Sequence, residues 1–289
     1  MTKLIALNGN SQKLDGGAMF GHVPKAVWSK WLTPDENNRV TLACRALLIQ
    51  EEGRNVLLET GIGAFFSPEL RARYGVQESE HVLLSSLEKI GLEHEDIDIV
   101  IISHLHFDHA GGLLKAWEEN KAPSLLFPKA TFMVGKEAWQ RACEPHVRDR
   151  ASFIPELKDL LQDSGRLEII EGKTSVLLGD KYHFFYSNGH TPGLMHTIFR
   201  EGDKPPIIFA SDLIPGSHWV HLPVTMGYDR APEMLIDEKR ALLDYAFEEN
   251  AFLFYTHDPR VVLSQVMRES PHKYSPYKML LSDAAVFEL

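Results

Sequence analysis

Four side chains that commonly bind metals fall within six residues of this chain. His104, His106, Asp108 and His109 belong to the stretch Ser-His-Leu-His-Phe-Asp-His, which directly follows the β-branched run Ile97–Ile102. The run predicts a buried strand, and side chains two residues apart in an extended chain face the same way. Three histidines and an aspartate at a strand end are costly to bury unless a cation neutralises and pairs them. The segment therefore predicts a metal centre.

Three later apolar runs also end in a residue that binds metals. Tyr182–Tyr186 leads into the Gly-His-Thr-Pro-Gly turn, Ile207–Ala210 leads into Ser-Asp, and Phe252–Tyr255 leads into Thr-His-Asp-Pro. Taken singly, an Asp after a strand is usually a turn or cap residue, and a His there is usually exposed. Taken together with the first segment, they complete a binuclear site. We assign His104, His106 and His190 to one metal, and Asp108, His109 and His257 to the other, with Asp212 as the bridging ligand.

The donor set also narrows the choice of cofactor. Imidazole nitrogens suit zinc, while manganese, iron and cobalt bind similar donors. We therefore expect two divalent ions, with zinc as the first candidate.

Composition limits the class of protein. The 289 residues carry a net charge of −10 and no basic run that would track a phosphate backbone, which disfavours nucleic acid. No stretch reaches the roughly 20 apolar residues of a membrane span. Cys44 and Cys143 give neither a disulfide framework nor a CxxC pair. We expect one domain over residues 1–289 and a cytoplasmic protein that acts on a small-molecule substrate. We expect no nucleic-acid or membrane partner. The sequence leaves open whether the protein forms a homodimer.

Hydrophobic periodicity predicts alternating strands and helices. The predicted strands are Ala43–Ile49, Val56–Leu58, Ile97–Ile102, Thr131–Val134, Leu167–Ile170, Ser175–Leu178, Tyr182–Tyr186, Met195–Arg200, Ile207–Ala210 and, as the final core strand, Ala251–Thr256. The predicted helices are Glu80–Gly91, Ala110–Glu119, Lys136–Cys143, Pro155–Gln162 and Pro232–Glu249. Strand clusters in both halves favour two sheets packed face to face with helices outside, an α/β (α+β) fold. Whether Pro145–Gly165 forms a lid stays open.

The segments HLHFDH, GHTPG, the Asp of ASDL and the His of YTHDP, in this order and spacing, resemble the metallo-β-lactamase superfamily. The resemblance covers nearly the whole chain. It implies a four-layer αββα sandwich with a binuclear site at one edge of the sheets, and Asp108 as both ligand and proton shuttle. Residues 14–25 and 34–39 resemble the branch of YtnP-type quorum-quenching lactonases, which is similar to N-acyl-homoserine lactone lactonases and methyl parathion hydrolase.

Three departures refine that resemblance. Class B1 β-lactamases carry a cysteine ligand and an Arg where this chain has His109, so β-lactam hydrolysis is disfavoured. Flavodiiron proteins replace the second motif histidine by Glu, whereas this chain has His106. The known acyl-homoserine lactonases place a Tyr three residues after the bridging Asp, and this chain has Pro215 there.

The expected activity is hydrolysis of lactones of the N-acyl-homoserine lactone type, or of related esters, by a hydroxide held between two metals. The alternatives are a glyoxalase II-like thioesterase, a phosphotriesterase and a non-catalytic metal-binding regulatory protein on the same fold. The C-terminal stretch 274–289 is short for the helical domain of a glyoxalase II, and the charge of −10 disfavours a ribonuclease of the superfamily.

The substrate wall is the least specific part of the sequence. Met19 and Phe20 lie in a glycine-flanked loop, and His218 and His221 follow Asp212 closely. Aromatic and apolar walls with a few polar anchors are typical of small-molecule pockets. We therefore expect these four residues to contact substrate. The alternatives are that Met19 and Phe20 pack in the core or at a dimer contact, and that the two histidines lie on the surface.

Overall fold

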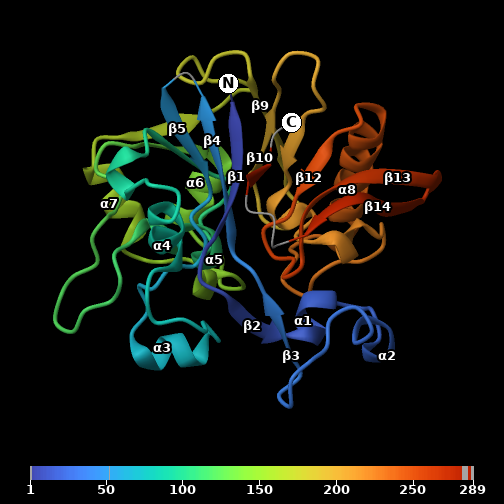
Figure 1. The fold of residues 1–289 in the computed structure, drawn as a ribbon. Coiled ribbons are helices and arrows are strands. Elements are labelled where there is room, and N and C mark those ends of the chain that lie inside the picture. Colours follow the sequence, from blue (N-terminus) through green and yellow to red (C-terminus); the bar gives the residue numbers. More distant parts are fainter. Residues whose placement is uncertain (1, 52, 282–285, 288–289) are drawn as a thin grey trace. The chain divides into compact units, whose positions relative to one another are not determined.

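A computed structural model describes residues 2–51, 53–281 and 286–287. The chain divides into two compact units, whose elements are drawn in Figure 1. The first unit comprises Met1–Gln12, Ala43–Glu171 and Ala285–Leu289, and the second comprises Lys13–Leu42 and Gly172–Ala284. The single domain expected over residues 1–289 stays a prediction.

The first unit is built on a mixed seven-stranded sheet in the order β15-β1-β4-β5-β6-β7-β8. Antiparallel pairs join β15, β1, β4 and β5, and parallel pairs join β5 to β8. The strands are β1 (Lys3–Asn8), β4 (Arg45–Glu51), β5 (Arg54–Leu58), β6 (Ile99–Ile102), β7 (Thr131–Gly135), β8 (Leu167–Ile170) and β15 (Val286–Phe287).

Helices cover one face of this sheet. Leu83 and Leu87 of α4 and Leu161 of α7 pack with alternate residues of the strands, such as Val100 and Ile102, in one buried cluster. The helices are α3 (Pro68–Arg73), α4 (Val82–Glu88), α5 (Phe107–Ala110), α6 (Lys136–Cys143) and α7 (Leu157–Asp163), with 3-10 turns η1 (His94–Asp96), η2 (Gly111–Leu113) and η3 (Arg150–Ser152). Burial of α7 shows that this part of Pro145–Gly165 belongs to the core.

The second unit is built on a six-stranded sheet in the order β14-β13-β12-β11-β10-β9. Only β11 and β12 run parallel among these neighbours. The strands are β9 (Tyr182–Ser187), β10 (Leu194–Phe199), β11 (Ile207–Phe209), β12 (Phe252–Phe254), β13 (Val261–Ser270) and β14 (Lys273–Leu281). A separate two-stranded sheet joins β2 (Gln12–Asp15) to β3 (Arg39–Leu42).

Helix α8 (Pro232–Glu248) buries one stripe against this unit's core. Pro at the first helical turn is pre-organised for the helix, and Leu235, Leu242 and Leu243 follow at helical spacing on the buried face. The shorter elements are α1 (Gly16–Phe20), α2 (Lys25–Trp28), η4 (Ser211–Leu213) and η5 (Ser217–Val220).

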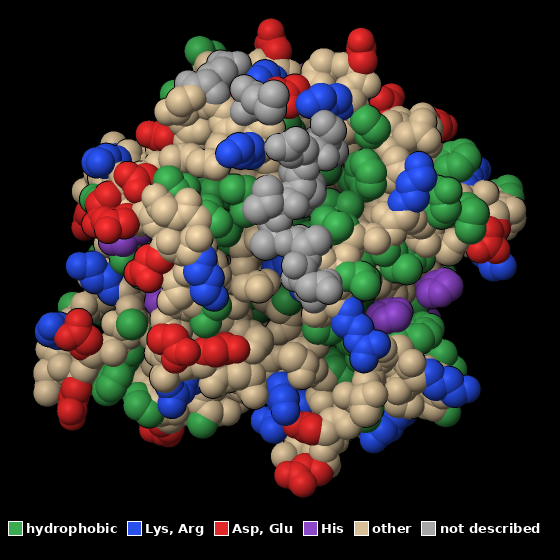
Figure 2. All heavy atoms as spheres, in the orientation of Figure 1, with side chains coloured by type: hydrophobic (Ala, Val, Ile, Leu, Met, Phe, Trp, Pro, Cys, Tyr) green, Lys and Arg blue, Asp and Glu red, His purple; other side chains and the backbone are tan. Residues whose placement is uncertain are grey.

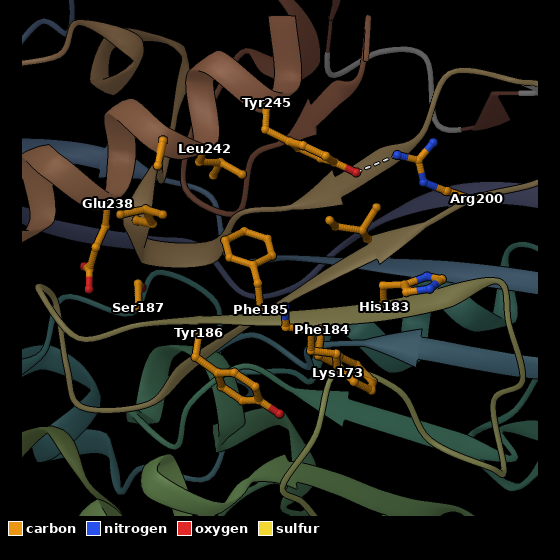
Figure 3. Close-up of a pocket in the computed structure, with 13 residues that line it drawn as sticks. Lys173, His183, Phe184, Phe185, Tyr186, Ser187, Arg200, Glu238, Leu242 and Tyr245 are labelled. Carbon is orange, nitrogen blue, oxygen red and sulfur yellow. Dashed lines mark hydrogen bonds between the residues drawn. The ribbon is translucent and has the colours of Figure 1, made fainter. Parts of the chain in front are cut away.

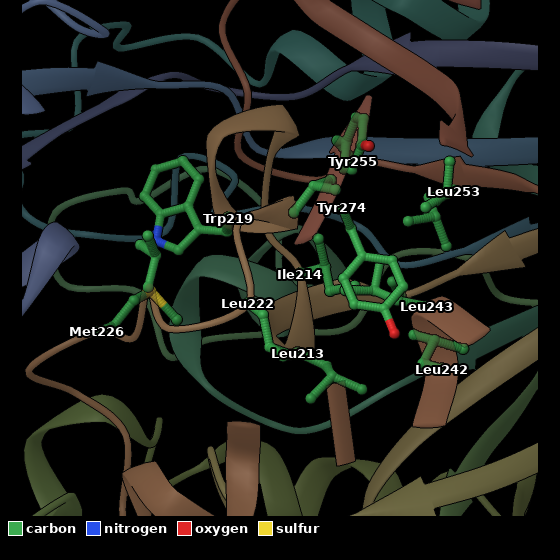
Figure 4. Packing of buried hydrophobic residues seen from close by; sticks show 14 of the residues in the cluster. Leu213, Ile214, Trp219, Leu222, Met226, Leu242, Leu243, Leu253, Tyr255 and Tyr274 are labelled. Carbon is green, nitrogen blue, oxygen red and sulfur yellow. The ribbon is translucent and has the colours of Figure 1, made fainter. Parts of the chain in front are cut away.

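Aromatic stacking holds the N-terminal segment onto the second core, part of which Figure 4 shows. The ring of Phe20 stacks on Trp28 at 5.6 Å and on Trp219 at 4.6 Å. Trp219 Nε1 donates to the Met19 carbonyl oxygen at 3.0 Å. In the same core, the fully buried Lys239 ammonium donates to the carbonyl oxygens of residues 219, 221 and 224. Burial lowers the pKa of Lys239 to about 7.

Most predicted elements are confirmed within a few residues, but three are wrong. The predicted helix Ala110–Glu119 is instead the short helix α5 and the turn η2, because Gly111 and Gly112 press against neighbouring backbone. A Cβ on either glycine would lie 2.3 Å or 2.1 Å from a carbonyl oxygen. The predicted strand Ser175–Leu178 is a turn, in which the backbone N–H groups of Leu178 and Gly179 donate to the Ser175 carbonyl oxygen.

The third error concerns the end of the second sheet. Ala251–Thr256 was expected to contain the final core strand, but β12 is followed by the long pair β13 and β14. Strand β14 contains Pro276 and lies at the sheet edge, where a missing N–H donor is tolerated. Strand β1 was also not predicted from the sequence.

The surface carries both signs of charge. On the face drawn in Figure 2, Asp and Glu side chains are interspersed with Lys and Arg. No helix within residues 2–51, 53–281 and 286–287 combines the length and apolar character that a membrane span requires.

Candidate metal centre

The first donor set lies where the central strand β6 ends. Because β5, β6 and β7 run parallel, their carboxyl ends share one sheet edge, and His104 follows directly after Ser103 there. His106 sits at the start of α5, and its Nδ1 lies 3.0 Å from His104 Nε2. His109 belongs to the same short helix, and its Nε2 lies 3.7 Å from Asp108 Oδ2. The first unit thus brings together all four donors of the HLHFDH segment.

Polar partners orient two of these imidazoles. Nδ1–H of His109 donates to Oε2 of the buried Glu59 at 2.9 Å, and Nδ1 of His104 lies 2.9 Å from the Ser103 hydroxyl. The other Glu59 oxygen accepts from the Ser103 backbone N–H at 3.1 Å. A carboxylate that fixes one ring nitrogen directs the other nitrogen towards a metal. Glu59 therefore acts as a positioning residue in this donor set.

The second donor set lies at the ends of three strands of the second sheet. His190 follows β9, Asp212 lies in η4 directly after β11, and His257 follows β12. His190 Nε2 lies 3.2 Å from Asp212 Oδ2, and His257 Nε2 lies 3.1 Å from Asp212 Oδ1. All three side chains are buried. Each oxygen of the carboxylate thus faces a different imidazole, which is the arrangement that a bridging ligand needs.

A further carboxylate orients His190. Asp229 Oδ1 accepts from His190 Nδ1 at 2.9 Å, and its Oδ2 accepts from the Met226 backbone N–H at 2.6 Å. The contact leaves His190 Nε2 turned towards Asp212. Asp229 is therefore the counterpart of Glu59 in the second unit.

The loop that carries His190 is fixed to helix α8. Both oxygens of Glu238 accept backbone N–H bonds, from Asn188 at 2.7 Å and from Gly189 at 2.9 Å. A Cβ on Gly189 would lie 2.4 Å from the Leu235 Cα, so only glycine fits this close approach. Packing against α8 thus explains why the first residue of the Gly-His-Thr-Pro-Gly segment is a glycine.

Backbone strain accompanies both donor sets. Glu59 has a φ of 66° and Ser211, next to Asp212, has a φ of 47°, both in the left-handed region. A non-glycine residue in this region costs about 1–3 kcal/mol and tends to occur at functional sites. The surrounding contacts therefore hold these two positions in place.

The donors fit a divalent transition metal. Buried imidazoles and carboxylates are the usual zinc ligands, and here the outer nitrogens of His109 and His190 are already held by carboxylates. Without a cation, closely packed imidazoles and a carboxylate would be an expensive group to bury. The structure therefore brings the predicted donors together as two sets, one in each unit.

The position expected to hold the lactonase Tyr has a structural role. The Pro215 carbonyl oxygen accepts from the His257 backbone N–H at 2.8 Å. Two residues on, the Ser217 backbone N–H and hydroxyl both donate to Asp258 Oδ2. The segment after Asp212 is therefore tied to the strand end that carries His257.

The predicted substrate contacts fall into two groups. Met19 and Phe20 are 2% and 0% exposed and belong to the second core. His218 and His221 both stack on the indole of Trp31, at ring distances of 5.6 Å and 5.7 Å. Burial lowers the pKa of His218, which favours its neutral form. Substrate contact by these four residues stays a prediction.

Neither positioning carboxylate was predicted from the sequence. Glu59 follows an apolar strand, as the donors do, so the same strand-end pattern would have found it. Asp229 lies in a loop between η5 and α8, where no strand pattern points to it.

Comparisons with known proteins agree with this geometry. A model of the metallo-beta-lactamase superfamily matches residues 39–257. An N-acyl homoserine lactonase of a Bacillus species is 25% identical over 240 residues, covering 78% of this chain and 85% of that protein. A solved probable metal-dependent hydrolase from Staphylococcus aureus has a TM-score of 0.84 and 26% identity, covering 96% of this chain and 98% of its own. AidC, a dizinc quorum-quenching lactonase, has a TM-score of 0.72 and 21% identity, covering 96% and 95% of the two chains.

Proposed function

Because the chain belongs to the metallo-beta-lactamase superfamily, whose model spans more than half of its length, we propose that it is a binuclear metal-dependent hydrolase that opens lactones. Its relatives include lactonases and metal-dependent hydrolases. The family match also agrees with the predicted α/β class, which the mixed sheets and helices of the two units confirm. The observation that carries the proposal is Asp212, each of whose oxygens faces a different buried imidazole.

We propose the following ligand assignment. His104, His106 and His190 hold one metal, and Asp108, His109 and His257 hold the other, with Asp212 bridging. Support comes from the convergence of donors within each unit and from the carboxylates that orient His109 and His190. Zinc is the proposed metal because the donors are imidazoles and carboxylates, and because one structural neighbour is described as dizinc.

Two divalent ions would supply Lewis acidity and bring the pKa of water from about 16 towards 7. The chain's own residues then set the geometry. Asp108, half-buried and close to His109, offers a carboxylate that would orient the attacking water and accept its proton. Asp108 returns that proton to the alkoxide formed when the lactone C–O bond breaks. The product is the ring-opened hydroxy acid, so one water is consumed for each ring opened.

Lactones are the proposed substrate class, with N-acyl-homoserine lactones as its first members and simple esters as related substrates. The support is that several relatives are N-acyl homoserine lactonases. A role in quorum quenching would follow from that substrate. Because Pro215 offers no hydroxyl, the carbonyl donor must come from elsewhere. Loss of such a donor without replacement costs roughly 100-fold in kcat. We propose His218 as the replacement and His221 as a further contact, with Met19 and Phe20 supporting this wall from within the core of the second unit.

The test is a hydrolysis panel on the zinc-reconstituted protein. It compares kcat/KM for acyl-homoserine lactones, γ- and δ-lactones, aryl esters, phosphotriesters, a glutathione thioester and a cephalosporin. We expect a lactone to give the highest value, and we expect Asp108→Asn to abolish that turnover, which assigns it to this site. A clear preference for the thioester, the phosphotriester or the cephalosporin would refute the lactonase proposal.

We also propose a location and an assembly state. Cys44 and Cys143 do not form a disulfide, which is consistent with the reducing cytoplasm that we propose. A homodimer is tested by sedimentation of the purified protein. A non-catalytic regulatory role is excluded if the panel gives turnover that depends on Asp108.

A further inference from the structure

A cavity of about 570 Å³ lies in the second unit between helix α8 and the six-stranded sheet, and Figure 3 shows its lining residues. One face of α8 forms a wall through residues spaced three or four apart, which are Glu238, Ala241, Leu242 and Tyr245. Strands β9 and β10 form the opposite wall. His183 pairs with Ile198 in their antiparallel register, so His183, Phe185, Ile198 and Arg200 share one sheet face.

The middle of the cavity is apolar. Figure 3 shows Phe185 between the strand and Leu242 on the helix, and Ile198 lines the same space. A volume of this size lies within the roughly 300–1,000 Å³ of small-molecule pockets. None of the lining residues belongs to the two metal donor sets, so this is a separate cavity.

Its two ends differ in charge. At one end, each oxygen of Glu238 already accepts a hydrogen bond from a backbone N–H group, so this carboxylate does not need a hydrogen-bond donor from a ligand. At the other end, Arg200 uses Nη2 to donate to the Tyr245 hydroxyl at 2.6 Å and to Glu249 Oε2 at 2.8 Å. Its guanidinium carries further N–H donors on Nε and Nη1. The exposed ammonium of Lys173 also lines the cavity and adds positive charge.

We propose that this cavity binds a carboxylate with an apolar chain of medium length. The chain lies between Phe185 and Leu242, and the carboxylate lies at Arg200. A planar guanidinium matches a carboxylate better than it matches a neutral head group. Lys173 adds a second cation to the lining, in which the carboxylate of Glu238 is held by two backbone N–H groups. A free fatty acid and an N-acyl amino acid share this chemistry. The proposal concerns binding and does not depend on which reaction the metal centre performs.

The experiment is isothermal titration of the metal-loaded protein with hexanoate, octanoate and decanoate. Burial of each added CH2 should tighten binding roughly fourfold until the cavity is filled. Decanamide serves as the neutral probe, and N-octanoylglycine is compared with decanoate to distinguish the two sources of the ligand. Whichever of these two binds more tightly identifies the preferred head group.

Two variants test the location. Arg200→Gln should weaken the binding of decanoate about tenfold or more, because a hydrogen bond to a charged group is lost. The binding of decanamide should stay unchanged. Ala241 lies on the exposed side of α8, and Ala241→Trp should weaken the binding of both decanoate and decanamide by filling the mouth of the cavity. The matched control is Arg268→Gln, which removes the ion pair between Arg268 and Asp244. This pair is about as exposed as the pair between Arg200 and Glu249, and the variant should bind decanoate like the wild type.

The outcomes are decisive in both directions. Thermal unfolding checks that each variant is folded, and unchanged kcat/KM shows that the metal centre is intact. Decanoate binding that survives both Arg200→Gln and Ala241→Trp would place the ligand elsewhere, such as at the metals, and would overturn the proposal. The same holds if decanoate shows no saturable binding, or if binding does not depend on chain length.

Discussion

Gly189→Ala should disturb the metal centre without touching any metal donor. The added Cβ would lie 2.4 Å from the Leu235 Cα and 2.5 Å from the Leu235 Cβ and backbone N. Carbon atoms pack at about 3.5–4.0 Å, so the loop or helix must move by roughly 1 Å. The Glu238 carboxylate also holds the Gly189 N–H, and this bond would be strained by the same movement. Overpacking of this kind costs about 1–3 kcal/mol.

The movement reaches the donor atoms through one peptide bond, because His190 follows Gly189. Metal–ligand distances vary by only about 0.2 Å around their usual values. A shift of about 1 Å at His190 should therefore lower the affinity for one metal by more than tenfold. A cost of this magnitude should lower the Tm by roughly 2–4 °C per kcal/mol. Thermal unfolding and metal competition with a coloured chelator measure both effects.

Gly172→Ala is the matched control. Nothing lies within 4 Å of a Cβ at that position, and its backbone is not left-handed. We expect its Tm and metal affinity to match the wild type. If Gly189→Ala also matches the wild type in both measurements, the account of this loop is wrong.

Three further predictions follow from single side chains. Asp108→Asn should abolish turnover while retaining most of the metal, since an amide oxygen can coordinate but cannot accept a proton; wild-type turnover would exclude Asp108 as the shuttle. Asp212→Ala should lose at least one metal by elemental analysis, and full occupancy would contradict its bridging role. His196 is fully buried beside the Ser187 hydroxyl, and burial lowers its pKa to about 3 from its ordinary value of 6.5. Between these values the unfolded chain binds the extra proton, so stability should fall as the pH drops from 6.5 towards 3, by an amount on the order of 5 kcal/mol. Urea unfolding across this pH range should show a shallower loss for His196→Gln, and an equal loss would contradict the assignment.

The sequence predicted which donor side chains converge within each unit, because every donor segment follows an apolar run. A strand end is a local feature, visible as a β-branched segment followed by Ser-His, Ser-Asp or Thr-His. The parallel neighbours β11 and β12 then bring Asp212 and His257 to the same sheet edge. Local periodicity was sufficient to predict these strands and the long helix α8.

The missed features depend on contacts between distant residues. Glu59 meets His109 across 50 residues, and Asp229 meets His190 across 39, so neither contact leaves a pattern in its own segment. The helix predicted after the first donors failed because two glycines pack against the backbone of another loop. Strand β14 was missed because Pro276 and exposed residues break its alternation.

The central claim is that the protein is a lactonase whose activity requires two bound metal ions. It is tested most directly by adding zinc in steps to the chelated protein while lactone hydrolysis is measured and bound metal is counted. We expect turnover to rise to a maximum at about two equivalents of bound zinc per chain, because the proposed reaction uses both ions. A protein that reaches full lactonase activity with one bound ion, or that hydrolyses lactones equally well after complete chelation, would contradict the account.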